Sequence, residues 1–240
     1  MNLITKFFAP APSPATPAPA DGPGLIAVPC LGTIHTKTAE ALLRLHFPFG
    51  SQHCHMTANT TPAAKRNQVI AQMLRWPQWQ WVFFVDSDMV PPPDTLTRLL
   101  ATGKDVVGAL YAGRHRALET GPDMVPPYVP ECGPESGDAL APQDIFDQLQ
   151  AVAWVGAAAL LVRRPVLERL AFPWFAAPEV DNEDVGFCAQ VRAAGFTVWC
   201  DGRVRVPHLQ TIPVTMGPTG PVTGVAAPSA RQKQLLAGAA

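Results

Sequence analysis

The stretch of sequence that decides the fold is WVFFVDSDMVPPPD, residues 81–94. Five apolar residues in succession are typical of a short strand that is buried on both faces of a sheet. The three prolines that follow cannot continue such a strand, so we expect Asp86 and Asp88 to stand at its C-terminal end. In open α/β sheets, ligands bind at that edge.

The spacing of Asp86 and Asp88 suggests a shared ligand. On an extended backbone, residues i and i+2 face the same way, so both carboxylates can converge on one divalent cation. Two bare carboxylates would repel a nucleoside diphosphate, whereas magnesium or manganese between them would turn the pair into a pyrophosphate clamp. The alternative is a helix-capping aspartate beside a solvated turn, and the DSD motif alone does not decide between the two.

The composition bounds the class of protein. With 240 residues, 48% of them apolar and 15% charged, the chain fits one domain with a substantial core. A formal net charge of −1 argues against a general polyanion binder. Five cysteines without CxxC spacing indicate neither a disulfide framework nor a zinc cluster, and we expect a reducing cytoplasm.

The folded domain is expected to span residues 24–210. The proline- and alanine-rich residues 1–23 predict a disordered tail, and residues 211–240 a flexible C-terminal tail. The longest apolar run, at 151–162, is too short to cross a bilayer, so we interpret it as core and expect no membrane insertion. Residues 114–148 are polar and proline-rich and predict a long loop or insertion.

Within the domain, predicted strands and helices alternate. This alternation predicts a parallel sheet with helices on both faces. The expected strands are 24–28, 81–85, 105–111 and 196–200, and the expected helices are 38–47, 62–76, 94–101, 165–171 and one that follows the acidic turn 179–187 and ends at Gly195.

The acidic turn allows two interpretations. Asp181 is a natural N-cap, and the helix dipole favours Glu183 and Asp184 in a first turn. The functional interpretation makes Asp184 a general base that takes the proton from an acceptor hydroxyl, with Glu183 binding the acceptor. Trp174, just before this turn, would either stack on a sugar or pack in the core.

The histidines lead to two different expectations about metal binding. His208 follows the last predicted strand and lies near the sheet edge, so we expect it to be a metal ligand. His53 and His55, in QHCHM at 52–56, bracket a cysteine, but no partner cluster follows them in the sequence. We expect no metal there.

Taken in order, these motifs resemble the GT-A glycosyltransferases, particularly small bacterial and bacteriophage members similar to family 2. The resemblance runs from Leu25 to His208 and rests on AAKRN (63–67), FFVDSDMVPPPDTLTRLL (83–100), DVVGALYAGR (105–114) and NEDVGFCAQVRAAGF (182–196). It implies an α/β fold: a single Rossmann-like GT-A domain with a mostly parallel central sheet flanked by helices.

The resemblance also implies a function and a site. The function is metal-dependent transfer of a sugar from a nucleoside-diphosphate sugar (UDP- or GDP-sugar) to an acceptor hydroxyl, with inversion and with Mn²⁺ or Mg²⁺. The implied donor-binding residues are Pro29, Arg66, Asn67, Asp86, Ser87 and Gly156; the implied metal ligands are Asp86, Asp88 and His208; the implied catalytic residues are Asp184 and Glu183.

The chain departs from the family at one place. Ala157 and Ala158 follow Gly156 where such proteins usually carry Thr-Gly. Small residues are kept, but a hydroxyl contact to the donor sugar is lost, so the donor sugar is left open.

Other functions and several acceptors stay open. FFVDSDMV also fits haloacid dehalogenase-like phosphatases, whose first aspartate is the nucleophile, but that chemistry usually calls for a later lysine, and only Lys104 and Lys233 follow. A non-catalytic sugar-nucleotide-binding module is the third interpretation. The acceptor could be a surface glycan, a lipid, a protein or a hydroxylated base in phage DNA. A basic rim for a polyanion would come from Arg114, His115, Arg116, Arg163 and Arg164.

Overall fold

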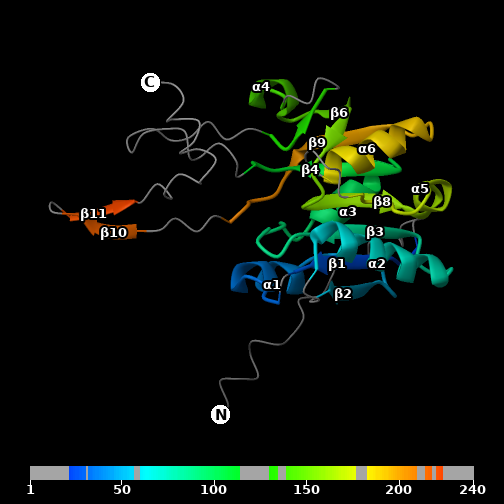
Figure 1. The fold of residues 1–240 in the computed structure, drawn as a ribbon, viewed down its shortest axis with the longest axis horizontal. Coiled ribbons are helices and arrows are strands. Elements are labelled where there is room, and N and C mark those ends of the chain that lie inside the picture. Colours follow the sequence, from blue (N-terminus) through cyan, green and yellow to red (C-terminus); the bar gives the residue numbers. More distant parts are fainter. Residues whose placement is uncertain are drawn as a thin grey trace, which may run out of the picture.

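A mixed β-sheet with helices on both faces forms the centre of the protein (Figure 1). The computed structural model describes residues 22–30, 32–56, 60–113, 130–134, 139–176, 183–209, 214–217 and 220–223. Within these ranges the main sheet has the strand order β2-β1-β3-β8-β4-β9-β6. The bounds of its strands are β1 Leu25–Pro29, β2 Gln52–Met56, β3 Trp81–Val85, β4 Val106–Leu110, β6 Leu149–Val152, β8 Ala159–Arg163 and β9 Val198–Arg205.

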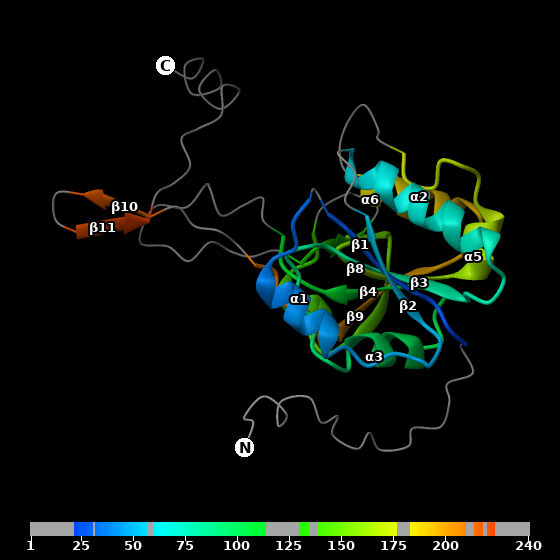
Figure 2. The same ribbon diagram turned by 90° about the horizontal axis from the view of Figure 1, so that it is seen from below.

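The helices divide between the two faces of the sheet. Figure 2 shows α2, α5 and α6 on one side and α1 and α3 on the other. The bounds of the described helices are α1 Thr36–Leu43, α2 Pro62–Arg75, α3 Thr95–Ala101, α4 Pro142–Ile145, α5 Arg164–Arg169 and α6 Glu183–Ala193. The predicted α/β fold, a central sheet between two helical layers, is therefore confirmed.

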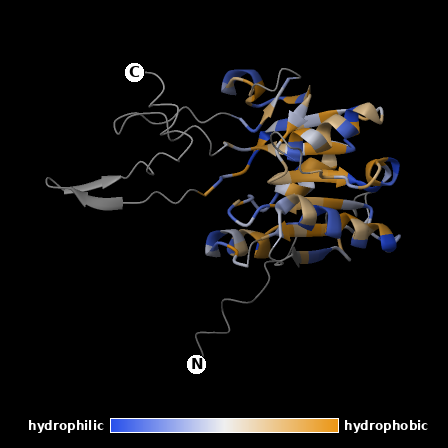
Figure 3. Ribbon diagram, in the orientation of Figure 1, coloured by the Kyte–Doolittle hydropathy of each residue, from blue (hydrophilic) through white to orange (hydrophobic). Residues whose placement is uncertain are grey.

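The apolar run of β3 is explained by burial on both faces. Val82 and Phe84 belong to the cluster that α2, α5 and α6 cover. Trp81, Phe83 and Val85 belong to the cluster that α1 and α3 cover. Because alternate residues of a strand face opposite ways, every residue of β3 enters one core or the other. The central strands are accordingly among the most hydrophobic parts of Figure 3.

The sheet is less parallel than the alternation of elements predicted. β1 runs parallel to β2 and β3, and β4 runs parallel to β9. β8 lies between β3 and β4 and is antiparallel to both, and β6 is antiparallel to β9. The first residue of β8, Ala159, pairs with the last residue of β3, Val85, so β8 starts at the edge of the sheet where β3 ends.

Several short strands were not predicted. QHCHM is β2, at the edge of the sheet, where the ring of His53 meets that of Phe47 edge to face at 5.3 Å. The apolar run 151–162 contributes to three strands, β6, β7 (Trp154–Val155) and β8. Part of the predicted insertion is ordered, since it contains α4 and β5 (Cys132–Gly133), and β5 pairs with β7.

The structure describes a few residues on either side of the predicted domain, 24–210. Gly22 and Pro23 already pack on the domain, because their carbonyl oxygens accept hydrogen bonds from Trp81 Nε1 (3.1 Å) and Gln80 N (2.8 Å). Beyond residue 210, β10 (Val214–Gly217) and β11 (Gly220–Thr223) pair as an antiparallel hairpin where a flexible tail was expected. Residues 1–21, 210–213, 218–219 and 224–240 lie outside the described residues. In the described ranges, no helix has the length and apolar character needed to cross a membrane.

The two-sided burial of β3 leads to a stability prediction. Phe84 is fully buried and its ring meets Phe175 edge to face at 5.7 Å, whereas Phe49 is fully exposed. Phe84→Ala should lower the free energy of unfolding by about 3–5 kcal/mol, because it leaves a cavity in the core. Phe49→Ala should change it by only about 0.5 kcal/mol. Urea denaturation of the two variants measures both values, and equal losses would contradict the assignment of β3 to the centre of the core.

Candidate functional site

The candidate site lies at the edge of the sheet where β1, β3, β4 and β9 end and β8 begins. The DSD motif is fixed there from two sides. The amide of Asp86 donates to the carbonyl oxygen of Ala158 at 3.0 Å, and the carbonyl oxygen of Ser87 accepts from the amide of His35 at 2.9 Å. The motif therefore connects the start of β8 to the segment between β1 and α1.

A short antiparallel pairing brings His208 to the DSD motif. Met89 and His208 form a β-bridge, the amide of Val90 donates to the carbonyl oxygen of Pro207 at 2.9 Å, and the amide of Leu209 donates to that of Asp88 at 2.8 Å. Backbone pairing thus places His208, which follows β9, directly beside Asp88.

Asp88 and His208 face each other through their side chains. His208 Nε2 lies 3.5 Å from Asp88 Oδ1, and His208 Nδ1 lies 2.9 Å from the carbonyl oxygen of Ala112. Since a carbonyl oxygen only accepts, Nδ1 is the donor in that contact, and in the neutral ring Nε2 then presents a lone pair toward the carboxylate. A carboxylate oxygen and an imidazole nitrogen are both metal-ligand atoms, so their chemistry fits a divalent transition metal.

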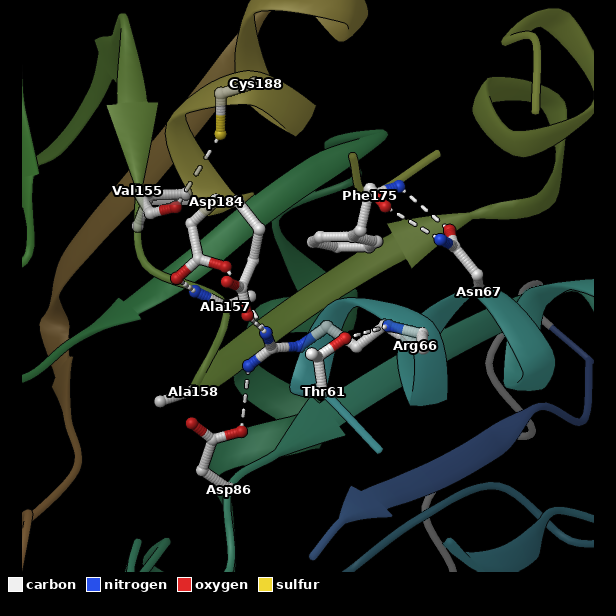
Figure 4. A network of polar contacts seen from close by, with 12 residues as sticks. Thr61, Arg66, Asn67, Asp86, Val155, Ala157, Ala158, Phe175, Asp184 and Cys188 are labelled. Atoms are coloured by element: carbon white, nitrogen blue, oxygen red, sulfur yellow. Dashed lines mark hydrogen bonds and ion pairs between the residues drawn. The ribbon is translucent and has the colours of Figure 1, made fainter. Parts of the chain in front are cut away.

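Arg66 brings three carboxylates together (Figure 4). Its side chain is only 3% exposed. Its two terminal nitrogens lie 2.9 Å from Asp86 Oδ1 and 2.8 Å from Glu183 Oε1, and the second is also 3.5 Å from Asp184 Oδ1. Arg66 thus links the N-terminal part of α2, the end of β3 and the first turn of α6. We call Arg66, Asp86, Glu183 and Asp184 the Arg66 network.

The start of α2 fixes the position of Arg66. Thr61 is the N-cap, and its hydroxyl oxygen accepts from the amide of Ala64 at 3.2 Å. Pro62 occupies the first helical position, where its missing N–H costs nothing. The next turn then directs Lys65 and Arg66 inward, and both are buried.

α6 is held in register by contacts one turn after the acidic pair. The Phe187 ring stacks on that of Phe175 at 4.4 Å, and Cys188 Sγ donates to the carbonyl oxygen of Val155 at 3.6 Å. The amide of Ala157 donates to Asp184 Oδ2 at 2.9 Å. The carboxylate of Asp184 is therefore oriented by Ala157 on one oxygen and by Arg66 on the other. The proposed N-cap Asp181 lies outside the described residues.

Burial and charge change the acidity of this network. Burial raises the pKa of Asp184 to about 6, although Arg66 and the Ala157 amide oppose the shift. Burial lowers the pKa of Arg66, but the charges of Asp86, Asp184 and Glu183 outweigh it and the net shift is upward. A carboxylate whose pKa lies near neutrality inside a polar cluster is suited to proton transfer.

The comparisons with known proteins identify the fold. No protein-family model matches the chain, and no curated protein matches it. A solved structure described as A197 from STIV is similar, with a TM-score of 0.60 at 17% identity, over 84% of this chain and 93% of that one. GalNAc-T7, solved with UDP, GalNAc and Mn²⁺, is similar with a TM-score of 0.54 at 10% identity, over 80% of this chain. The fold is of the GT-A type. This chain spans 44% of the GalNAc-T7 chain.

The three predicted metal ligands divide between two places at this edge of the GT-A fold. Asp88 and His208 lie together, whereas Asp86 lies in the Arg66 network. Among the residues that the structure describes, no three His, Cys, Asp or Glu side chains are arranged so that they could hold one metal ion.

Of the predicted donor-binding residues, some lie at the site edge and others contact neighbouring parts of the protein. Pro29 ends β1, and it and Ser87 lie at the site edge. Asn67 has another role, since its amide nitrogen donates to the carbonyl oxygen of Phe175 (2.7 Å) and its amide oxygen accepts from the amide of Phe175 (2.9 Å). At Gly156 a Cβ atom would lie 1.8 Å from the hydroxyl oxygen of Tyr111, so this glycine makes room for a tyrosine.

Sequence reasoning did not assign Tyr111 or Lys65. Tyr111 follows a buried strand at the same edge as the DSD motif, a position that could have revealed it. Its hydroxyl accepts from the amide of Ala158 at 3.3 Å, and burial, followed by the charge of Asp184, raises its pKa well above the ordinary value. Lys65 is 1% exposed and donates from Nζ to the carbonyl oxygen of Cys30, just beyond β1, at 2.7 Å.

Several other predicted candidates have structural roles. Trp174 is buried and donates from Nε1 to the carbonyl oxygen of Leu167 at 2.9 Å, as core packing requires. Arg163 donates to the carbonyl oxygens of Leu100 and Lys104, and Arg164 to those near the C-terminal end of α2. The remaining members of the basic rim, residues 114–116, lie outside the described residues.

The Arg66 network leads to the second prediction. Arg66→Leu should destabilise the protein by about 3–5 kcal/mol, because it leaves three carboxylates close together without their cation. The control is Arg98→Leu, which removes a half-exposed guanidinium 3.8 Å from Asp94 and should cost about 0–1 kcal/mol. Thermal or urea unfolding at pH 7 measures both, and a loss for Arg66→Leu no larger than the control would show that the network does not hold α2, β3 and α6 together.

Proposed function

We propose that this protein is a metal-dependent glycosyltransferase that moves a sugar from a nucleoside-diphosphate sugar to an acceptor hydroxyl with inversion. The observation that carries the proposal is the pairing, at one edge of a GT-A fold, of the Asp88–His208 contact with the buried carboxylate of Asp184. The similarity to GalNAc-T7, solved with UDP, GalNAc and Mn²⁺, supports the choice of donor and metal.

Asp88 and His208 would hold the divalent metal, with Asp86 as the third protein ligand. When bound, a divalent metal supplies a Lewis acid that stabilises the negative charge on the departing diphosphate. Asp86 has to leave Arg66 to join the other two ligands, and Glu183 and Asp184 remain to neutralise the guanidinium when it does. Pro29 and Ser87 would line the nucleotide, and Arg66, freed from Asp86, would approach the diphosphate.

Asp184 would act as the general base. Its carboxylate accepts the proton of the acceptor hydroxyl as the acceptor oxygen forms a bond to the anomeric carbon, and the bond from that carbon to the diphosphate oxygen breaks with its electron pair. The Ala157 amide and Arg66 keep the carboxylate oriented toward the edge. Glu183, beside it on Arg66, would bind the acceptor. Attack on the face opposite the leaving group inverts the anomeric configuration.

The phosphatase interpretation fits the structure less well. Lys104, the nearer of the two candidate lysines, lies between α3 and β4, with its ammonium 3.8 Å from the centre of the Trp199 ring. Trp199 is near the start of β9, whose end carries the site, so this lysine is at the opposite edge of the sheet from Asp86.

The metal assignment is tested by nucleotide binding. Mn²⁺ should raise the melting temperature of the protein with UDP or GDP, and Asp88→Asn or His208→Ala should abolish that increase because each removes a ligand atom. Asp94→Asn serves as the control, because it removes the same charge from a half-exposed aspartate at the start of α3, and it should keep the increase. Nucleotide binding that is indifferent to EDTA and to Asp88→Asn would refute the metal site.

The general base is tested by transfer kinetics. Asp184→Asn can still accept the Ala157 hydrogen bond but cannot take a proton, so it should bind the nucleotide normally and lose about 10²–10⁴-fold in transfer rate. Because the base must be ionised and its pKa is about 6, the wild-type rate should fall as the pH drops below about 6 and level off above it. In Asp184→Asn the residual rate should lack that step.

Two results would contradict this mechanism in different ways. A product with retained anomeric configuration would exclude a single displacement even if Asp184 proved essential. Nucleotide binding without transfer to any acceptor, and without hydrolysis of the donor, would favour the non-catalytic binding module instead.

A further inference from the structure

A cavity adjoins the candidate site on the side of β4 and β9. It has a volume of about 300 Å³ and opens between the residues that follow these two strands and the end of α4. Tyr111, Ala112, Phe146 and Pro207 are among the residues that line it. This volume is at the lower end of the range for small-molecule sites.

The cavity shares its walls with the site. Ala112 contributes the carbonyl oxygen that accepts from His208 Nδ1, and Pro207 directly precedes His208. The Tyr111 ring meets the His208 ring edge to face at 5.8 Å, while its hydroxyl reaches the amide of Ala158. A molecule in the cavity would therefore lie within reach of both the Asp88–His208 pair and the segment that orients Asp184.

The lining is almost entirely carbon. Among the lining residues only Arg205 carries a charge, and that charge is already compensated: its guanidinium pairs with Asp147 and lies over the Phe146 ring, 4.6 Å from the ring centre. A bare sugar would give up the hydrogen bonds between its hydroxyls and water here without regaining any from the protein. An aryl or alkyl group makes no such hydrogen bonds with water, so its burial is favourable.

The position of the cavity separates it from the donor. In the sheet order, β1 and β3 lie on one side of β8, and β4 and β9, which carry the cavity, lie on the other. The proposed nucleotide contacts at Pro29 and Ser87 belong to the first side. A molecule bound in the cavity would therefore lie on the other side of β8 from the proposed nucleotide contacts.

We propose that this cavity binds an apolar aglycone of the acceptor, an aryl or alkyl group attached close to the hydroxyl that is glycosylated. The inference rests on the proposed function and narrows its acceptor to a hydroxylated molecule with an apolar part. Pro130, which pairs with Ala112 in a β-bridge, also lines the cavity and adds to its apolar surface.

The test compares matched ligands on the full-length protein. 4-Nitrophenyl and octyl glucosides and galactosides are titrated against the corresponding methyl glycosides by calorimetry or ligand-observed NMR, with UDP and Mn²⁺ present. The aryl or alkyl glycosides should bind at least about tenfold more tightly than the methyl glycosides. Ala112→Trp, which fills the cavity without changing its backbone carbonyl, should abolish that preference. Gln78→Trp adds the same side chain at an exposed position and should keep it.

The outcomes separate this inference from the function on which it rests. Equal binding of apolar and methyl glycosides, or a preference that survives Ala112→Trp, would overturn the cavity assignment while Mn²⁺-dependent UDP binding stands. A preference that Ala112→Trp abolishes, in a protein that binds no nucleoside diphosphate, would overturn the glycosyltransferase proposal and with it the role of the cavity as an acceptor site.

Discussion

One buried guanidinium determines how the site is assembled. Arg66 has too little exposure to be solvated by water, so it requires carboxylates, and the carboxylates of Asp86, Glu183 and Asp184 require a cation. These groups come from a helix, a strand end and a second helix that are far apart in the sequence. Satisfying the charges therefore fixes the relative positions of α2, β3 and α6 at the edge where the chemistry is proposed.

The same network carries more negative than positive charge. Three carboxylates surround one guanidinium, and Asp88 adds a fourth a short distance along the chain. An anionic donor would be repelled by this edge unless a cation accompanied it. The charges of the whole edge, and not only the spacing of two aspartates, therefore support the proposed divalent metal.

Much of this arrangement could be predicted from the sequence. The five apolar residues before Asp86 predicted a strand buried on both faces, and proline placed its end, because burial and the missing N–H act locally. The direction of β8 could not be predicted in the same way, since it depends on where the chain re-enters the sheet after residues 114–148. The hydrogen-bond partners of polar side chains could not be predicted from the sequence either. Asn67 follows Arg66 immediately, yet it binds the backbone of Phe175, and Gly156 leaves room for the hydroxyl of Tyr111.

The antiparallel insertion of β8 also has a consequence for the order of folding. β3 and β4 follow each other in the chain, but neither pairs with the other, and the strand that joins them extends to Arg163. During synthesis, the half-sheet β2-β1-β3 can form its hydrogen bonds early. It can be connected to β4 only after β8, which pairs with both β3 and β4, has left the ribosome. Until then β3 exposes one edge of its backbone, and the nascent chain depends on a contact of long sequence separation to close its core, a topology that slows folding.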